Sequence, residues 1–207
     1  MSAPLRVAVV EDDHSMRTAL VRLLSAAGIE ATSHASADEF VREEDCAGFD
    51  CLVVDVHLPR MDGLQLQAEL KRIAPFASLI FITGRGDLAL GMHAMRQGAI
   101  DFLEKPVDEE ALLAAIRRGA DQSRKQRETH TERLQLEQRC ESLTPREREV
   151  FGLITRGLLN KQAGAELGTT ERTIKAHRAR VMEKMGADSL AKLVRMAALL
   201  GIHEPRN

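Results

Sequence analysis

The stretch from Leu52 to Gly63, LVVDVHLPRMDG, is the strongest indication of the fold. Its apolar, β-branched residues end in one carboxylate, Asp55, and Pro59 and the pair Asp62-Gly63 follow. A short continuous apolar run is typical of a strand buried on both faces of a parallel sheet. Proline and Asp-Gly predict a sharp turn after that strand. The stretch therefore predicts an acid at the carboxyl end of a buried strand, where sheets of this kind bind their ligands.

The rest of the first 120 residues repeats the same alternation of apolar runs and helical patterns. The apolar runs that predict strands cover 5–10, 29–34, 51–55, 78–83 and 99–105. Apolar residues at helical spacing follow each run, over 14–27, 36–45, 64–73 and 87–97 and in a helix opened by Pro106. Five βα repeats predict an α/β domain over residues 1–121, with a flavodoxin-like (βα)5 parallel sheet covered on both faces.

The chain changes character after residue 121. Residues 122–141 are rich in charge and contain neither Pro nor Gly, which predicts a solvated helical linker. A coiled coil is the alternative, but the apolar residues form no sustained heptad. Residues 142–207 predict a separate all-α domain of four helices, over 145–156, 160–167, 171–185 and 189–200. Its start signal has Thr144 as N-cap, Pro145 next and Glu147 at the third helical position, and Asp188 is the expected N-cap of the last helix.

Composition limits the function classes. The chain has 207 residues, of which 44% are hydrophobic and 29% charged, as in a globular protein. Because it has no Trp and no Tyr, neither residue can have a catalytic or stacking role. Its N-terminus does not resemble a signal peptide, and no run reaches the ~20 apolar residues of a membrane span. Three cysteines without CxxC spacing (Cys46, Cys51 and Cys140) favour a reducing compartment and argue against a structural zinc site. We therefore expect a cytoplasmic protein.

Charge is distributed unevenly between the two parts of the chain. Residues 1–141 hold 17 Lys and Arg against 24 Asp and Glu, whereas residues 142–207 hold 12 against 7. An acidic front and a basic back predict two domains with different partners, and phosphates are a natural partner for the basic one. Simple variation of surface charge is the alternative explanation.

Five polar side chains lie at the carboxyl ends of the predicted strands. They are Glu11 and Asp12 after the first, Asp55 at the end of the third, Thr83 at the end of the fourth and Lys105 at the end of the fifth. Close carboxylates repel one another unless a cation lies between them, and Mg²⁺ is the natural candidate. With a lysine and a hydroxyl beside it, Asp55 is suited to accept a phosphoryl group as a nucleophile. The alternative is that each acid only caps the helix that follows it.

Four motifs in this region are similar to those of bacterial response-regulator receiver domains. They are EDD (11–13), VVDVHLPRMDG (53–63), FITGRGD (81–87) and DFLEKP (101–106), and the resemblance covers residues 5 to about 120. It implies that a sensor histidine kinase phosphorylates Asp55. It also implies that Asp12, Asp55 and the backbone carbonyl of His57 hold Mg²⁺ or Mn²⁺, with Glu11 acting through water.

The same resemblance implies roles for the residues that respond to phosphate. Thr83 and Lys105 would bind the phosphoryl group, and Phe102 would be the aromatic switch that turns inward as Thr83 moves. The surface around the fourth helix and fifth strand would then repack and favour dimers. The resemblance also implies a cis peptide bond between Lys105 and Pro106.

The C-terminal domain has helix-turn-helix spacing. Gly164, Gly168 and Ile174 match a small residue at a helix crossing, a turn glycine and an apolar anchor. In the helix from Glu171, apolar residues form one stripe and basic and small residues the opposite face. The residues expected to contact DNA are Thr170, Arg172, Lys175, Ala176, Arg178, Ala179 and Arg180. An ordinary amphipathic helix with a basic, solvated face is the alternative.

A second resemblance supports the DNA-binding interpretation. LTPREREV (143–150), GLLNKQ (157–162) and TIKAHRARVMEKMGADS (173–189) are similar to the LuxR-type DNA-binding domain. The two halves together resemble the NarL/FixJ group of response regulators, nearer its FixJ members. That implies a homodimer on phosphorylation, binding to double-stranded DNA at paired half-sites, contact with RNA polymerase and a role as activator. Ala163-Gly164 replaces the more usual Ile-Ala, and an interior glycine costs a helix about 1 kcal/mol, so we expect a thinner core there.

Two other functions fit parts of the sequence. An aspartate-nucleophile phosphohydrolase would also use Asp55 as its nucleophile. Such enzymes commonly have a DxD pattern, whereas this chain has His57 two residues after Asp55. We therefore do not expect an enzyme. The other alternative is a DNA-binding regulator whose receiver serves only for docking or dimerisation. The intact acids and Lys105 argue against it.

Overall fold

A computed structural model describes residues 4–42, 45–84 and 88–202. The chain divides into two compact units, residues 1–127 and 128–207, and each is described by itself. Among the described residues, no helix combines the length and the apolar character that a membrane span requires.

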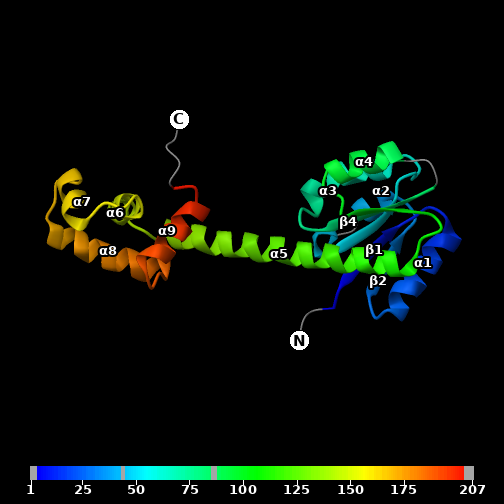
Figure 1. Cartoon of the computed structure of the whole chain (residues 1–207), viewed down its shortest axis with the longest axis horizontal. Helices are drawn as coiled ribbons and strands as arrows, with labels where there is room; N and C mark the ends of the chain where they lie inside the picture. The colour runs from blue at the N-terminus through cyan, green and yellow to red at the C-terminus, as the bar shows by residue number, and fades with distance from the viewer. Residues whose placement is uncertain (1–3, 43–44, 85–87, 203–207) are drawn as a thin grey trace. The chain divides into compact units, whose positions relative to one another are not determined.

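The first unit is built on a five-stranded parallel sheet (Figure 1). Its strands are β1 (Arg6–Val10), β2 (Glu30–His34), β3 (Cys51–Asp55), β4 (Ser78–Thr83) and β5 (Asp101–Glu104), in the order β2-β1-β3-β4-β5. In the register of the central strands, Val10 pairs with Val54 and Asp55 pairs with Ile82. The carboxyl ends of β1, β3 and β4 therefore meet at one edge, which confirms the predicted flavodoxin-like fold.

Helices cover both faces of this sheet. They are α1 (His14–Ala26), α2 (Ala37–Val41), α3 (Gly63–Ile73), α4 (Leu88–Arg96) and α5 (Glu109–Glu141), with a short 3₁₀ helix at Cys46–Gly48. One core joins α2, α3 and α4 to the sheet through residues such as Leu66, Leu70, Phe81 and Ala94. The other joins α1 and α5 to the opposite face through Leu20, Leu24, Leu112 and Ile116. Because both faces are covered, the strands are apolar throughout, as their sequences predict.

Two helix boundaries in this unit differ from the prediction by more than one residue. The helix capped by Ser36 ends at Val41 rather than at residue 45, and residues 43–44 of that stretch lie outside the described residues. The last helix begins at Glu109 rather than at Pro106, because Asp108 supplies its cap: the Asp108 carboxylate accepts the Ala111 N–H at 2.8 Å. Residue 87, the predicted start of the fourth helix, also lies outside the described residues.

The turn between β3 and α3 is stabilised by the residues from which it was predicted. Asp62 accepts the N–H of Gln65 and Gln65 accepts the N–H of Asp62, so a capping box starts α3. Arg60 has a positive φ of 67°, a conformation that non-glycine residues rarely adopt. The sharp turn predicted from Pro59 and Asp62-Gly63 is therefore present, and it returns the chain to the sheet directly after Asp55.

The second unit contains α6 (Pro145–Thr155), α7 (Asn160–Glu166), α8 (Glu171–Met185) and α9 (Leu190–Leu199). Thr144 and Glu147 form the predicted capping box at the start of α6. The turn between α7 and α8 has Gly168 with a φ of +61°, as the helix-turn-helix spacing predicts. The N-cap of α9 is Ser189 rather than Asp188, since the Ser189 hydroxyl accepts the Lys192 N–H.

Helix α5 continues through the whole predicted linker, to Glu141. Its early part belongs to the first unit: Ser123 is fully buried, and Arg127 donates to the Phe49 carbonyl at 2.8 Å. Its last turns belong to the second unit, where Leu136 lies in the core. Residues 128–135 are all exposed. The limits 1–121, 122–141 and 142–207 remain a prediction, and 128–135 is the stretch with the least packing.

Candidate functional site

Three acids converge at the carboxyl edge of the sheet. Carboxylate oxygens of Glu11, Asp12 and Asp55 all lie within 4.8 Å of one another. Glu11 and Asp55 are buried, whereas Asp12 is exposed. Glu11 and Asp12 follow β1 directly and Asp55 ends β3, so the pairing of these neighbouring strands brings the acids together. Oxygen ligands at this spacing suit a hard divalent cation.

Lys105 compensates the two buried acids. Its ammonium lies 2.6 Å from Oδ2 of Asp55 and 2.8 Å from Oε2 of Glu11. Burial raises the pKa of Glu11 and the charge of Asp55 adds to the rise, while Lys105 partly offsets it. Burial by itself would lower the pKa of Lys105, but its hydrogen bonds to Asp55 and Glu11 outweigh burial and raise it. A lysine held in its charged form beside a carboxylate can neutralise oxygens that arrive there.

The remaining predicted residues surround Asp55. The backbone N–H of His57 donates to Oδ1 of Asp55 at 3.0 Å. The His57 side chain is exposed and takes no part in this hydrogen bond. Thr83 is buried at the end of β4, and its carbonyl accepts the Lys105 N–H at 2.7 Å. The Lys105–Pro106 peptide bond is cis, as the resemblance implies. The carboxylate thus has one oxygen toward a backbone donor and the other toward the ammonium.

Phe102 lies on β5 and is half-buried, with its ring centroid 6.3 Å from that of Phe81. Beside it, Met92 and Met95 of α4 are 53% and 44% exposed. They line a shallow surface groove of about 600 Å³ together with Gly91, Arg96, Asp101 and Phe102. No sequence pattern indicated this groove, because methionines at helical spacing are equally typical of a core.

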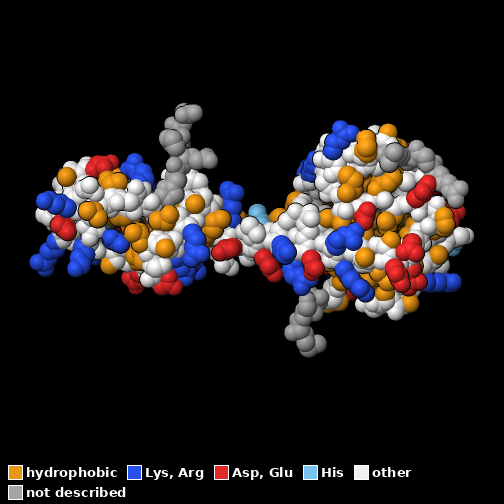
Figure 2. Space-filling view, viewed as in Figure 1, with side chains coloured by type: hydrophobic (Ala, Val, Ile, Leu, Met, Phe, Trp, Pro, Cys, Tyr) orange, Lys and Arg blue, Asp and Glu red, His pale blue; other side chains and the backbone are white. Residues whose placement is uncertain are grey.

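The recognition-helix candidate, α8, presents the predicted face to solvent. Ile174, Val181 and Met185 are fully buried. The exposed residues of the predicted set are Thr170, Arg172, Lys175, Ala176, Ala179 and Arg180. Arg178 differs: it is half-buried, and its guanidinium donates to the Asn160 side chain of α7 at 3.3 Å. Figure 2 shows Lys and Arg side chains gathered over α8, as a phosphate-binding surface requires.

Gly164 occupies a tighter place than expected. It is buried in α7, and a Cβ there would lie 2.9 Å from the Thr169 carbonyl oxygen. The expected gap in the core is therefore absent, because the backbone of the turn before α8 comes close to Gly164 and uses that space. The small residue permits the close approach of the turn.

The ends of α8 and α6 are joined by contacts that sequence reasoning missed. Lys184 of α8 donates to Glu147 at 2.6 Å, and Glu147 is only 2% exposed. This ion pair and the backbone contact at Thr144 lower the pKa of Glu147 to about 2. Arg139 of α5 donates to the Met185 carbonyl at 3.0 Å, at the C-terminal end of α8. These partners are far apart in sequence, so no local pattern could reveal them.

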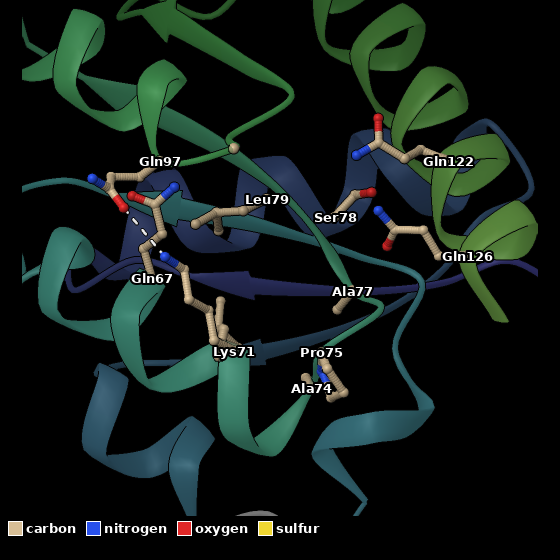
Figure 3. Close-up of a pocket in the computed structure, with 12 residues that line it drawn as sticks. Gln67, Lys71, Ala74, Pro75, Ala77, Ser78, Leu79, Gln97, Gln122 and Gln126 are labelled. Carbon is tan, nitrogen blue, oxygen red and sulfur yellow. Dashed lines mark hydrogen bonds between the residues drawn. The ribbon is translucent and has the colours of Figure 1, made fainter. Parts of the chain in front are cut away.

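A separate cavity of about 140 Å³ lies at the opposite edge of the sheet (Figure 3). Ser78 and Leu79, at the start of β4, line it, and the Lys71 ammonium donates to Gln97 at 3.2 Å beside it. Gln122 and Gln126 of α5 complete the wall. None of the predicted phosphoacceptor residues lines this cavity, so it is distinct from the acidic site.

Two families match this chain. Residues 7–117 match the family described as "Response regulator receiver domain". Residues 141–197 match the family described as "Bacterial regulatory proteins, luxR family". The first match covers the sheet and the acidic site, and the second covers α6 to α8 and most of α9.

Curated relatives align over almost the whole length. Nodulation protein W of Bradyrhizobium diazoefficiens is 44% identical over 95% of this chain and 86% of its own. Transcriptional regulatory protein FixJ of Azorhizobium caulinodans is 40% identical over 98% of this chain and 96% of its own. The response regulator protein TodT of Pseudomonas putida is 36% identical over 93% and 85%. None of these names describes an enzyme.

Solved structures give the same assignment. The structure of the response regulator StyR matches with a TM-score of 0.81 and 42% identity, over 95% of this chain and 99% of that one. Full-length FixJ from B. japonicum matches with a TM-score of 0.59 and 35% identity, over 98% and 100%.

Proposed function

The chain belongs to the response regulators of two-component systems, with an N-terminal receiver and a C-terminal LuxR-type DNA-binding domain. We propose that phosphorylation of Asp55 controls its binding to DNA. The observation that supports this most directly is the setting of Asp55. It ends a buried strand, lies among acids that could hold a cation, and has its Oδ2 2.6 Å from a lysine ammonium. The phosphohydrolase alternative is set aside, because the relatives are regulators.

The chemistry at Asp55 would be a phosphoryl transfer from a phosphohistidine of a sensor kinase. The bond between phosphorus and the imidazole nitrogen breaks, and a bond forms between phosphorus and one carboxylate oxygen of Asp55. The His57 N–H holds the other carboxylate oxygen in place. Lys105 would supply a positive charge for the phosphoryl oxygens, and Thr83 would donate its hydroxyl to one of them.

The donor set fits Mg²⁺ or Mn²⁺. The acids of the cluster offer hard oxygen ligands within 4.8 Å of one another, and Lys105 is the group that balances their charge in this structure. Asp12 and Asp55, with the His57 carbonyl, would hold the ion, and Glu11 would act through water. When bound, the ion would neutralise charge on the phosphoryl oxygens.

The output would be a dimer on DNA. Phe102 and Thr83 would move on phosphorylation, and the groove of α4 and β5 with its exposed methionines is the apolar surface available for a second receiver. Two linked recognition helices bind paired half-sites more tightly than one. We further propose an activator that contacts RNA polymerase in the cytoplasm, where DNA and a kinase are both accessible.

The test compares the full chain with and without beryllofluoride and Mg²⁺, on an operator obtained by selection from random sequence. We expect wild type to dimerise, by analytical ultracentrifugation, and to bind DNA at least several-fold more tightly. Asp55→Asn should lose both responses. Asp50→Asn is a matched control, because Asp50 precedes the other end of β3 and its carboxylate accepts the Arg6 N–H.

Two results would contradict this function. If treated wild type neither dimerises nor binds more tightly, the receiver serves for docking or dimerisation alone. If Asp55→Asn responds as wild type does, the phosphoryl group is carried elsewhere.

A further inference from the structure

Arg17 of α1 contacts the loop that carries two of the acids. Its Nη1 donates to the Glu11 carbonyl at 2.6 Å and to the Asp12 carbonyl at 3.1 Å. Its Nη2 lies 3.2 Å from Nδ1 of His14. Arg17 is half-buried, so part of the guanidinium is shielded from water. One side chain thus bonds two successive backbone carbonyls of the β1–α1 loop.

These two carbonyls belong to the peptide planes on either side of the Asp12 Cα. Because each peptide unit is planar, the orientation of both planes fixes φ and ψ of Asp12. The backbone then sets the direction in which the Asp12 side chain leaves the loop. Asp12 is exposed, so packing does not hold this side chain in place. Glu11, by contrast, is buried and already paired with Lys105.

The charge of Arg17 affects metal affinity in the opposite direction to any ordering of the Asp12 backbone. Its positive charge near the acids repels a cation, so electrostatics alone would make removal of Arg17 strengthen metal binding. Ordering of the Asp12 backbone would make the same removal weaken it. The sign of the change in metal affinity therefore distinguishes the two effects.

We propose that Arg17 is a positioning residue of the metal site, which orients Asp12 through the two backbone carbonyls and thereby sets the affinity for the divalent cation. This role rests on the proposed function of the acidic cluster. Partners that orient metal ligands typically contribute about tenfold or more to metal affinity. On this proposal ordering outweighs the repulsion, so removal of Arg17 should weaken metal binding.

The experiment measures Mn²⁺ binding to the full chain by electron paramagnetic resonance of the free ion, since the chain has no Trp to report binding. We expect Arg17→Ala to raise the Kd for Mn²⁺ about tenfold. Arg17→Lys keeps the charge and a donor, and should recover part of the affinity. Arg22→Ala is the matched control, because it removes the same charge from the exposed side of α1 and should leave Kd unchanged.

Heat unfolding in EDTA accompanies each titration, so a loss of fold is separated from a loss of affinity. A purely structural Arg17 would lower the unfolding temperature and leave Kd of the folded protein unchanged, which overturns the proposal. An unchanged or lower Kd in Arg17→Ala overturns it as well. If wild type binds no Mn²⁺, the metal site of the proposed function fails and the role of Arg17 fails with it.

Discussion

Gly63 illustrates how closely the chain turns around Asp55. A Cβ at this position would lie 2.6 Å from the Asp55 carbonyl oxygen and 2.9 Å from the Phe81 ring. The backbone is one of these neighbours, so a methyl group cannot be accommodated by the rotation of a side chain. The glycine after Asp62 is thus required by the close return of the chain to β3, in addition to its place at the start of α3.

Gly63→Ala should destabilise the first unit by about 1–3 kcal/mol, the usual cost of an overpacked core. The measurement is urea unfolding of the full chain, with amide exchange of the β3 and β4 backbone as the probe of the first unit. Gly84→Ala is the control, because a Cβ at Gly84 has no described atom within 4 Å. Equal stability of the two variants would show that the turn has room to move.

The ion pair between α6 and α8 is a property of two elements. Glu147 both caps α6 and accepts from Lys184, and its pKa is lowered to about 2 from an ordinary 4.5. A carboxyl whose pKa is lower in the folded state stabilises the fold when it is ionised. Its contribution is complete above about pH 4.5 and is lost as the pH falls toward 2.

Glu147→Gln should therefore make the stability of the second unit less dependent on pH between about 4.5 and 2. Glutamine can still form the capping box, so the substitution removes the charge and keeps the cap. The measurement is amide exchange of α6 and α8 in the full chain across this pH range. Glu149→Gln, on the exposed side of α6, should keep the dependence of wild type. If the stability of Glu147→Gln depends on pH as strongly as that of wild type, other acids cause the pH dependence.

Across the whole molecule, α5 is the element that both units share. It packs on the first unit up to Arg127 and enters the core of the second at Leu136, and every residue between 128 and 135 is exposed. Burial therefore gives little support to the helix over this stretch. A helix with little tertiary packing depends on its own backbone hydrogen bonds and helix propensity, and is easily interrupted.

Thr131→Pro should interrupt α5 and leave both units folded, because proline removes a helical hydrogen bond where no core residue lies. Amide exchange of each unit checks the folding. We expect the DNA affinity of the untreated chain to stay unchanged and its increase with beryllofluoride to become smaller, since a more flexible linker lowers the effective concentration of the second DNA-binding unit in a dimer. Thr131→Ala should behave as wild type. Loss of protection in either unit would show that 128–135 stabilises the folds.

The sequence alone was sufficient to predict the five βα repeats, the helical second domain and the candidate residues Glu11, Asp12, Asp55, Thr83 and Lys105. It could do so because apolar periodicity, turn residues and helix caps act over a few neighbouring residues. Boundaries set by competing caps, such as Asp108 before α5, were less accurate. The roles of the site residues and the DNA contacts remain predictions.

The contacts between groups that are distant in sequence are a property of the folded chain. Strand order placed Lys105 between Glu11 and Asp55, and the fold of the second unit brought Lys184 to Glu147 and Arg139 to the end of α8. Arg17 lies close to the acids in sequence, yet its hold on two carbonyls depends on the shape of the loop. Such contacts arise when parallel strands and packed helices bring separate segments together. A local sequence pattern cannot predict them.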